Sequence, residues 1–202
     1  MALGDSYASL SELKTRLGIT DSSDDTALTA ALATASRGAE KYCGRQFNLA
    51  ALASARVYRP DSSRLVMVDD FATALGLVVA TDEGDDGVFQ TTWAAADYQL
   101  EPLNGVVDGE PGWPYWRIRV VGSRWFPCGR RATVQVTAQW GWAAVPAAVK
   151  EASLIMAEET FKLKDAPFGV AGFGEFGAVR VRDNPKAAGL LAPYRRNPVL
   201  VA

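Results

Sequence analysis

The residues that could carry out chemistry are few in this chain, and they are not arranged as a catalytic site. The sequence contains no histidine, which removes the commonest general base and the usual partner of a nucleophilic serine. Glu158 and Glu159 are neighbours in a predicted helix, so their carboxylates point in different directions and do not form a pair of acids. The two cysteines, Cys43 and Cys128, cannot form a four-ligand zinc site without histidines, and we expect reduced packing residues rather than a disulfide. The sequence therefore predicts neither an enzyme nor a bound cofactor or metal.

Two loops share only part of the pattern of a ligand-binding motif. Asp82–Gly87 is acidic like a calcium-binding loop, but its third position is Gly84, and its twelfth is Trp93 in place of a bidentate glutamate. Gly169–Gly174 follows a predicted helix rather than a strand, and no Gly-Lys-Ser/Thr sequence closes it, unlike a phosphate-binding loop. We interpret the first loop as a turn and predict no ligand for the second.

The six tryptophans lie between Trp93 and Trp142, interleaved with arginines, and they have two interpretations. They form either a surface on which nucleic-acid bases stack or the core of a small β-domain with arginines on its wet face. Acids outnumber bases by eleven to eight between residues 56 and 143, which favours the core. A further alternative is a carbohydrate-binding β-domain, in which Trp113 and Trp125, both near turns, would be the sugar platforms.

Length and composition suit a folded protein with an uneven distribution of charge. The 202 residues are enough for one large or two small domains, and 49% of them are apolar, so a substantial core is available. The net charge is only −2, but residues 176–202 carry +4 and leave −6 on the remainder. A basic tail on an acidic body favours an acidic partner surface or nucleic acid. The start of the chain lacks the pattern of a secretory leader, and no apolar run is long enough to span a membrane, so we expect neither.

Apolar residues recur at helical spacing towards both ends of the chain. A capping box at Ser9–Glu12 opens a short helix that ends at Gly18, and a longer alanine-rich helix runs from about Thr26 to Cys43. A third helix is predicted from Val145 to about Lys164, and a short fourth helix follows Pro185 as far as Leu191.

Between these helices the apolar pattern changes to a period of two, which is typical of strands separated by turns. The predicted strands are Arg64–Val68, Leu75–Ala80, Tyr98–Leu100, Trp116–Val121 and Ala132–Trp140. Polar residues alternate with apolar ones in the last two, so one face is expected to be wet. These residues are Arg117, Arg119, Thr133, Gln135 and Thr137.

The predicted fold class is α+β: a small α-helical bundle of about four helices, with an inserted antiparallel β-domain (a small sandwich or barrel) and an extended C-terminal tail. The predicted parts are an N-terminal helical hairpin (1–50), the β-domain (51–144), the third bundle helix (145–165), a Gly/Phe-rich loop (166–183), and the short helix with the basic tail (184–202).

Two features of the predicted fold suggest contacts with other chains. The third helix carries two neighbouring apolar rows, where a surface helix needs only one. Its second row, Leu154, Ala157 and Phe161, is expected either to face a neighbouring subunit or to lie inside a compact bundle. The loop that follows combines glycines, which lose the most backbone entropy on ordering, with phenylalanines that are costly to leave in water. We interpret it as an assembly loop, formed by Phe168, Gly169, Gly172, Phe173, Gly174, Phe176 and Gly177.

The order of these parts resembles the head–tail connector (adaptor) proteins of long-tailed bacteriophages. The resemblance covers roughly the first 47 and the last 60 residues, with no role transferred to the β-domain, which the shortest members replace with a brief linker. The segments that carry it are Leu10–Ile19 with the acidic turn after it, the alanine-rich Ala30–Arg45, Trp140–Lys150 at the entry to the third helix, and Asn184–Arg196 at the closing helix and tail.

The resemblance implies a virion structural protein without catalytic activity, made in the bacterial host cytoplasm and without a membrane partner. It implies a ring, usually of twelve subunits, which docks beneath the portal protein of the capsid, extends the channel for double-stranded DNA and offers a platform to the downstream neck (stopper) protein. The acidic body suits a lumen through which DNA passes without sequence-specific binding.

The tail of such proteins typically wedges into the portal, and arginine suits this role because its planar fork pairs with carboxylates. The expected portal contacts are Arg180, Arg182, Lys186, Tyr194, Arg195, Arg196, Pro198, Val199 and Leu200. The alternative for the same basic tail is a DNA-binding packaging factor, which would bind duplex DNA in a salt-dependent way.

Overall fold

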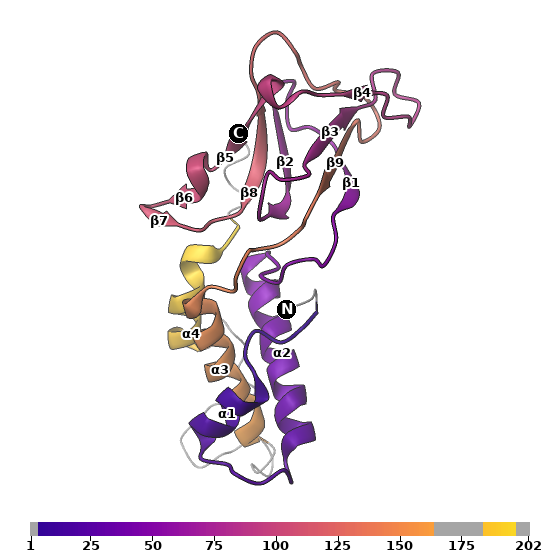
Figure 1. Cartoon of the computed structure of the whole chain (residues 1–202). Coiled ribbons are helices and arrows are strands. Elements are labelled where there is room, and N and C mark those ends of the chain that lie inside the picture. Colours follow the sequence, from indigo (N-terminus) through magenta and orange to yellow (C-terminus); the bar gives the residue numbers. More distant parts are fainter. Residues whose placement is uncertain (1–3, 164–183, 197–202) are drawn as a thin grey trace. The chain divides into compact units, whose positions relative to one another are not determined.

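The structure is a computed structural model that describes residues 4–163 and 184–196, and these residues fall into two compact units (Figure 1). The helical unit comprises the described residues of 4–48 and 145–196, and the β unit comprises residues 49–144. Within the described residues, no helix combines the length and the apolar character needed to cross a membrane.

The helical unit contains four α-helices in its described part, as the sequence predicts. They are α1 (Leu10–Leu17), α2 (Asp25–Cys43), α3 (Ala147–Lys162) and α4 (Pro185–Leu191), and a 3₁₀ turn, η6 (Ala192–Tyr194), follows α4. The helix α3 packs against each of the other three, and Figure 1 shows α2 and α3 side by side with α4 against α3. The α+β class is confirmed, and each helix lies within about two residues of its predicted bounds.

Local signals define both ends of α1. The Ser9 hydroxyl accepts a hydrogen bond from the Glu12 backbone N–H at 3.2 Å, and the Glu12 carboxylate accepts one from the Ser9 N–H at 2.8 Å. This capping box pairs two backbone donors that the first turn would otherwise leave unpaired. Gly18 ends the helix in the left-handed conformation, with φ of 71°, which favours a residue without a Cβ atom.

Ion pairs connect α1 to α3 and add to a small apolar contact. Leu13 is the only fully buried residue of α1. The Arg16 guanidinium bonds Glu151 at 2.7 Å and Glu158 at 2.8 Å. Lys150 forms a further ion pair with Glu12. Hydrogen bonds from Lys150 and Ser9 hold the pKa of Glu12 at about 2 against the small opposing effect of burial.

The β unit consists of antiparallel sheets that share one core. The order β1-β9-β3-β4 describes the first sheet, β2-β8-β5 the second, and β6-β7 a short ribbon. The bounds are β1 Ser54–Tyr58, β2 Leu65–Phe71, β3 Val78–Thr81, β4 Thr91–Thr92, β5 Tyr98–Glu101, β6 Val106–Val107, β7 Glu110–Pro111, β8 Tyr115–Val120 and β9 Val134–Ala138.

Buried side chains from both larger sheets pack into a single hydrophobic cluster. It includes Val66, Ile118 and Val136, each fully buried, and Trp140, which is 1% exposed. The indole N–H of Trp140 donates to the Ser54 carbonyl at 2.8 Å, so its polar atom is paired although the ring is buried. The indole N–H of Trp93, in the same cluster, likewise donates to the Thr81 hydroxyl at 3.0 Å.

The strand predictions missed β1 and the short strands β4, β6 and β7, and they ended β2 too early. The strand β2 extends past Val68 through Asp69 and Asp70, whose carboxylates pair with Arg56 at 2.6 Å and with the indole N–H of Trp142 at 3.0 Å. The strand β1 was not predicted because it is a sheet edge with little apolar alternation. In the predicted wet face, Thr133 is fully buried, and its hydroxyl donates to the Pro127 carbonyl.

We predict that Glu12→Gln destabilises the helical unit at neutral pH and that this effect disappears in acid. Glutamine keeps the capping hydrogen bond but loses the ion pair with Lys150. Because Glu12 is partly exposed, the expected loss is at most about 1 kcal/mol. The folded-state pKa is lowered, so the contribution is present above the ordinary value of 4.5 and is lost as the pH falls towards about 2. Urea unfolding followed by helical circular dichroism measures it, and a constant difference between the two proteins throughout that range would contradict the assignment.

Candidate assembly site

The segment Asn184–Arg196 is held against the helical unit at both of its ends. Asn184 caps α4 by accepting the Ala187 N–H at 2.9 Å, while its amide donates to Glu159 near the end of α3. At the other end, the Arg196 N–H donates to the Cys43 carbonyl at 2.8 Å. Cys43 is the last residue of α2, where carbonyls lack helical partners, so Arg196 satisfies one of them. The segment therefore spans from the end of α3 to the end of α2.

A row of three aromatic rings joins this segment to the start of the chain. Phe47 lies 5.7 Å from Tyr7 and 5.9 Å from Tyr194 between ring centroids, both in edge-to-face geometry. The Tyr7 hydroxyl donates to Glu40 at 2.5 Å and accepts the Phe47 N–H at 3.1 Å. Burial, reinforced by the Glu40 hydrogen bond, raises the pKa of Tyr7, so the phenol stays neutral. The row packs three segments that are far apart in sequence around the end of α2.

Apolar burial supports the same attachment. Leu191 and Ala187 on α4 are fully buried, and Cys43 is 1% exposed. The Cys43 thiol donates weakly to the Leu191 carbonyl at 3.7 Å. Burial raises the pKa of Cys43 to about 12, so the thiol remains protonated and unreactive at physiological pH. The cysteine is therefore a packing residue, as the sequence predicts.

Positive charge accumulates where this segment meets α2. The Arg195 guanidinium lies 5.2 Å from the ring centroid of Tyr42, and its side chain is exposed. The carbonyl end of a helix carries partial negative charge, which favours cations there. Gly44, with φ of 63°, ends α2, and a Cβ atom at that position would contact Arg196 at 3.7 Å. Positive charge therefore lies at this end of α2, where the described closing segment ends at Arg196.

Comparison with known proteins assigns this arrangement to a family. Residues 7–102 match the family model described as phage gp6-like head-tail connector protein. This match, over just under half of the chain, supports a head–tail connector protein. Connectors are structural proteins of the particle neck, and this is not a class of enzymes. No curated protein matches the chain.

Solved structures with the fold of this connector come from gene transfer agent (GTA) particles. A chain from the neck of an empty GTA particle, with C6 symmetry, is 19% identical with a TM-score of 0.59, and the match covers 96% of this chain and 92% of that chain. A chain from the neck of a native GTA particle, with C12 symmetry, is 17% identical with a TM-score of 0.55, over 99% and 98%. A chain from the native GTA virion is 19% identical with a TM-score of 0.52, over 96% and 92%. At these identities the likeness shows a shared fold.

The family match extends further into the chain than the sequence resemblance indicates. It starts in the predicted N-terminal segment but continues through β5 of the β unit. The structural matches cover 96% or more of the chain, so they include the β unit as well. The β unit is therefore part of the fold that the connector shares with these neck proteins, although the family resemblance in the sequence is confined to the two ends of the chain.

The structure describes four of the nine predicted portal-contact residues of the connector. Tyr194 and Arg196 are half-buried in contacts with Phe47 and Cys43, whereas Arg195 and Lys186 are exposed. Lys186 lies near the start of α4, so it is separated from the other three by the length of the helix. The residues outside the described part are Arg180, Arg182, Pro198, Val199 and Leu200, together with the whole predicted assembly loop, Phe168, Gly169, Gly172, Phe173, Gly174, Phe176 and Gly177.

The second apolar row of α3 lies inside the helical unit. Leu154 is 9% exposed, Ala157 is fully buried and Phe161 is 8% exposed. Because α1, α2 and α4 surround α3, these side chains are covered within one chain. Their burial favours the interpretation of α3 as the central helix of a bundle, and it leaves little of this row for a neighbouring subunit.

The aromatic and acidic residues of the β unit largely serve its own packing. Trp93, Trp113, Trp140 and Trp142 are buried, which supports the core interpretation, and only Trp125 is largely exposed. Trp113 is therefore not available as a sugar platform.

The acidic loop is held by hydrogen bonds within the loop itself. Asp82 is buried, and its carboxylate accepts the Gly87 N–H at 2.7 Å and the Asp86 N–H at 3.2 Å. Cys128, unlike Cys43, is exposed as a free thiol.

Sequence reasoning missed Tyr7 and Phe47 as residues that position the tail. No local spacing marks them, because their partners come from distant parts of the chain. An indirect signal is present: each is a large apolar side chain in a segment predicted to be irregular, immediately beside a predicted helix end. Such residues often pack across a helix terminus, as in the hydrophobic staple.

We predict that two substitutions in the closing segment act in opposite directions. Tyr194→Ala removes the ring contact with Phe47. It should lower the free energy of local opening of the closing segment by about 1–2 kcal/mol. Gly189 lies in the interior of α4 with open space at its Cβ position. Gly189→Ala should therefore raise the free energy of local opening by about 0.5–1 kcal/mol. Hydrogen exchange at the Arg196 amide reports both, because this N–H is bonded to the Cys43 carbonyl. Equal exchange rates in all three proteins would contradict the proposed attachment.

Proposed function

We propose that this connector forms a ring in the virion neck, docked beneath the portal protein, where it extends the DNA channel and presents a platform to the downstream neck (stopper) protein. The observation that carries the proposal is the attachment of Asn184–Arg196 between α3 and α2, together with the family match. This attachment gives the basic tail a fixed point of departure, which an anchor requires. The gene transfer agent proteins of the same fold are described as parts of a neck.

In this proposal the basic residues divide into two roles. Arg195 and Lys186 are exposed and contact acidic groups of the portal, together with Arg180, Arg182, Pro198, Val199 and Leu200 from outside the described residues. Tyr194 and Arg196 act as positioning residues, because their contacts with Phe47 and Cys43 direct the tail. The assembly loop, with Phe168, Phe173 and Phe176, is buried against neighbouring subunits or the portal.

Twelve copies would form the ring, by analogy with the C12 symmetry of the native GTA neck. The exposed face of α2 is suited to a contact between copies, because it is small and uncharged. Thr29 and Thr34 donate their hydroxyls to the helix's own carbonyls at 2.8 and 2.9 Å, so burial would leave neither hydroxyl unpaired. The face consists of Thr26, Ala27, Thr29, Ala30, Ala33 and Thr34.

The lumen of such a ring passes double-stranded DNA without sequence-specific binding. The chain has a net charge of −2, and outside residues 176–202 the charge is −6. A surface of this sign does not hold phosphates, so DNA can slide past it. The same distribution restricts the alternative, a DNA-binding packaging factor, to the basic tail. The virion neck is the proposed location, after synthesis in the bacterial host cytoplasm.

The proposal predicts that the full-length chain adds a ring to purified portal rings from the same genome and that a chain truncated after Gly177 does not. Arg195→Gln should weaken this docking by about threefold or more, since an interfacial charge pair is lost. Arg130→Gln is the matched control, because Arg130 is an exposed arginine of the β unit. Negative-stain electron microscopy and co-sedimentation measure the docking.

Either of two outcomes would contradict this assignment. Portal rings that gain no density from the full-length chain would remove the docking role. If the full-length chain then shifts duplex DNA at low salt and the truncated chain does not, the DNA-binding alternative replaces it. Equal docking by Arg195→Gln and the wild type would remove Arg195 from the interface.

The ring contact has its own test in Ala30→Glu. The side chain is exposed on α2 and glutamate favours helix, so the monomer should remain folded. Buried against a neighbouring copy, the charge should reduce the number of copies per portal. Thr15→Glu, exposed on α1, serves as the control and should give complete rings. Complete rings with Ala30→Glu would show that this face of α2 lies outside the subunit contact.

A further inference from the structure

The β unit has a surface groove around the side chain of Trp125. The groove has a volume of about 460 Å³. Its lining combines two aromatic rings with one acid, one base and one hydroxyl, supplied by Glu83, Trp93, Ser123, Arg124, Trp125 and Pro127. All of these residues come from the β unit, from the acidic loop, from the segment after β4, and from the connection between β8 and β9.

Trp125 is held in its exposed position by the residues on either side of it. Its side chain is 66% exposed, whereas Phe126 is fully buried and stacks on Trp93 with ring centroids 4.7 Å apart. On the other side, Arg124 forms an ion pair with Asp97 at 2.9 Å. Because both neighbours are fixed, the indole between them is presented outward on an ordered backbone.

Backbone hydrogen bonds fix the same stretch of chain. The Phe126 N–H donates to the Ser63 carbonyl at 2.9 Å. The Arg64 guanidinium donates to the carbonyls of Gly122 at 2.7 Å and Arg124 at 3.3 Å. A preorganised aromatic side chain loses little conformational freedom on binding, which is the property of an interface anchor.

The charges in the groove leave one carboxylate uncompensated. The Arg124 guanidinium is engaged with Asp97 and also lies 5.6 Å from the ring centroid of Trp93. Glu83 is exposed and has no ion pair or hydrogen bond with any residue that the structure describes. The loop that carries it is held by buried Asp82. Burial opposes ionisation of Asp82, but the backbone N–H groups of Gly87, Asp86 and Asp85 outweigh it and keep its pKa below the ordinary value.

We propose that this groove docks a positively charged side chain, an arginine or a lysine, presented by a partner protein. The cation would lie on the exposed face of Trp125 and pair with the Glu83 carboxylate. Cation–π attraction and the unpaired negative charge act on the same ligand group, and tryptophan is the best aromatic partner for a cation. Arginine fits best, because its flat guanidinium stacks on the indole while its N–H groups reach a carboxylate.

The same observations disfavour a sugar as the occupant. Carbohydrate recognition needs several polar side chains free to bond hydroxyl groups, and with Arg124 engaged by Asp97 the lining offers only Glu83 and Ser123. A single free carboxylate beside an indole selects for charge instead. The inference concerns the β unit alone and goes beyond the proposed portal docking, which concerns the tail of the helical unit, so either can fail without the other.

The test titrates the full-length chain with a short peptide of alternating glycine and arginine. The neutral control is the same peptide with citrulline in place of arginine, which keeps the shape and removes the charge. The readout is the indole N–H resonance of Trp125 in a ¹⁵N–¹H spectrum, assigned by its loss in Trp125→Phe. We expect a saturable shift with the arginine peptide only. Glu83→Gln should weaken binding by about two- to fivefold in this readout. Trp125→Ala lacks the reporting resonance, so isothermal titration calorimetry measures its affinity, and we expect a loss of at least about threefold.

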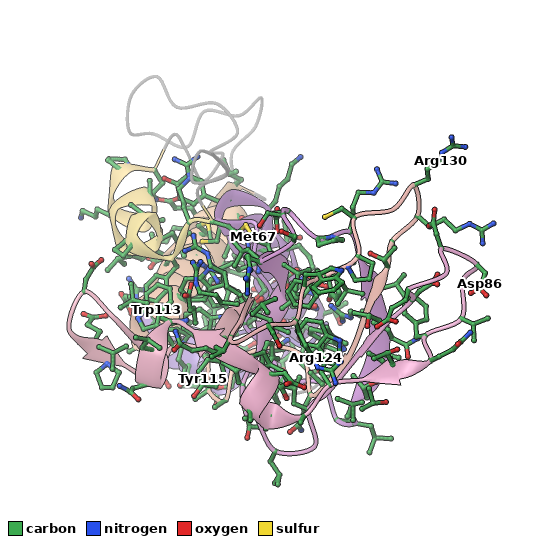
Figure 2. The ribbon with its side chains drawn as sticks, turned by 90° about the horizontal axis from the view of Figure 1, so that it is seen from above. Met67, Asp86, Trp113, Tyr115, Arg124 and Arg130 are labelled. Atoms are coloured by element: carbon green, nitrogen blue, oxygen red, sulfur yellow. The ribbon has the colours of Figure 1, made fainter. Side chains whose placement is uncertain are left out.

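Two controls keep the result interpretable. Arg130→Gln should bind the arginine peptide like the wild type, because Figure 2 shows Arg130 projecting from a loop at the margin of the β unit. The buried Trp93 indole, which donates to the Thr81 hydroxyl at 3.0 Å, reports in each variant that the core is intact.

Three results would overturn the proposal. These are the absence of any shift, an equal shift with the citrulline peptide, or unchanged affinity in Glu83→Gln. A shift caused by maltohexaose or chitohexaose, with none from the arginine peptide, would replace it with a carbohydrate site.

Discussion

The carbonyl end of α2 is the junction on which the helical unit depends. A helix leaves its last carbonyls without partners, and burying them unpaired is costly. In this chain the Arg196 N–H pairs the Cys43 carbonyl, while Phe47 packs between Tyr7 and Tyr194 just beyond it. One local requirement therefore joins the start of the chain, the turn after α2 and the closing segment. It also fixes where the basic tail begins, which links the packing of the unit to its proposed role as an anchor.

The β unit satisfies a different requirement, since its strands and loops carry many charged side chains around a small core. The carboxylate of Asp82 accepts hydrogen bonds from backbone N–H groups, and that of Asp70 accepts one from the indole N–H of Trp142. Asp69 forms an ion pair with Arg56. Glu83, which lines the groove with Trp125, has no ion pair or hydrogen bond with a described residue, and this is why we propose that groove, and not the acidic loop as a whole, as a binding site.

The sequence predicts the parts of the fold that depend on local signals. The capping box at Ser9 and the left-handed glycines after α1 and α2 are short-range features, so the helices were predicted within about two residues. The edge strand β1 and the end of β2 were missed, because their polar residues are explained only by partners elsewhere in the β unit. Tyr194 and Arg196 were predicted as tail residues from charge and composition, but their packing against the end of α2 requires the folded chain.

The central claim is that the closing segment, fixed on the end of α2, anchors a ring of this connector to the portal. Electron cryomicroscopy of necks isolated from particles that contain this chain tests it most directly. The account predicts one closed ring of the connector in contact with the portal, with Tyr194 still packed on Phe47 and the tail continuing from Arg196 into portal density. A neck in which the connector touches only downstream proteins, or in which the tail leaves away from the portal, would contradict it.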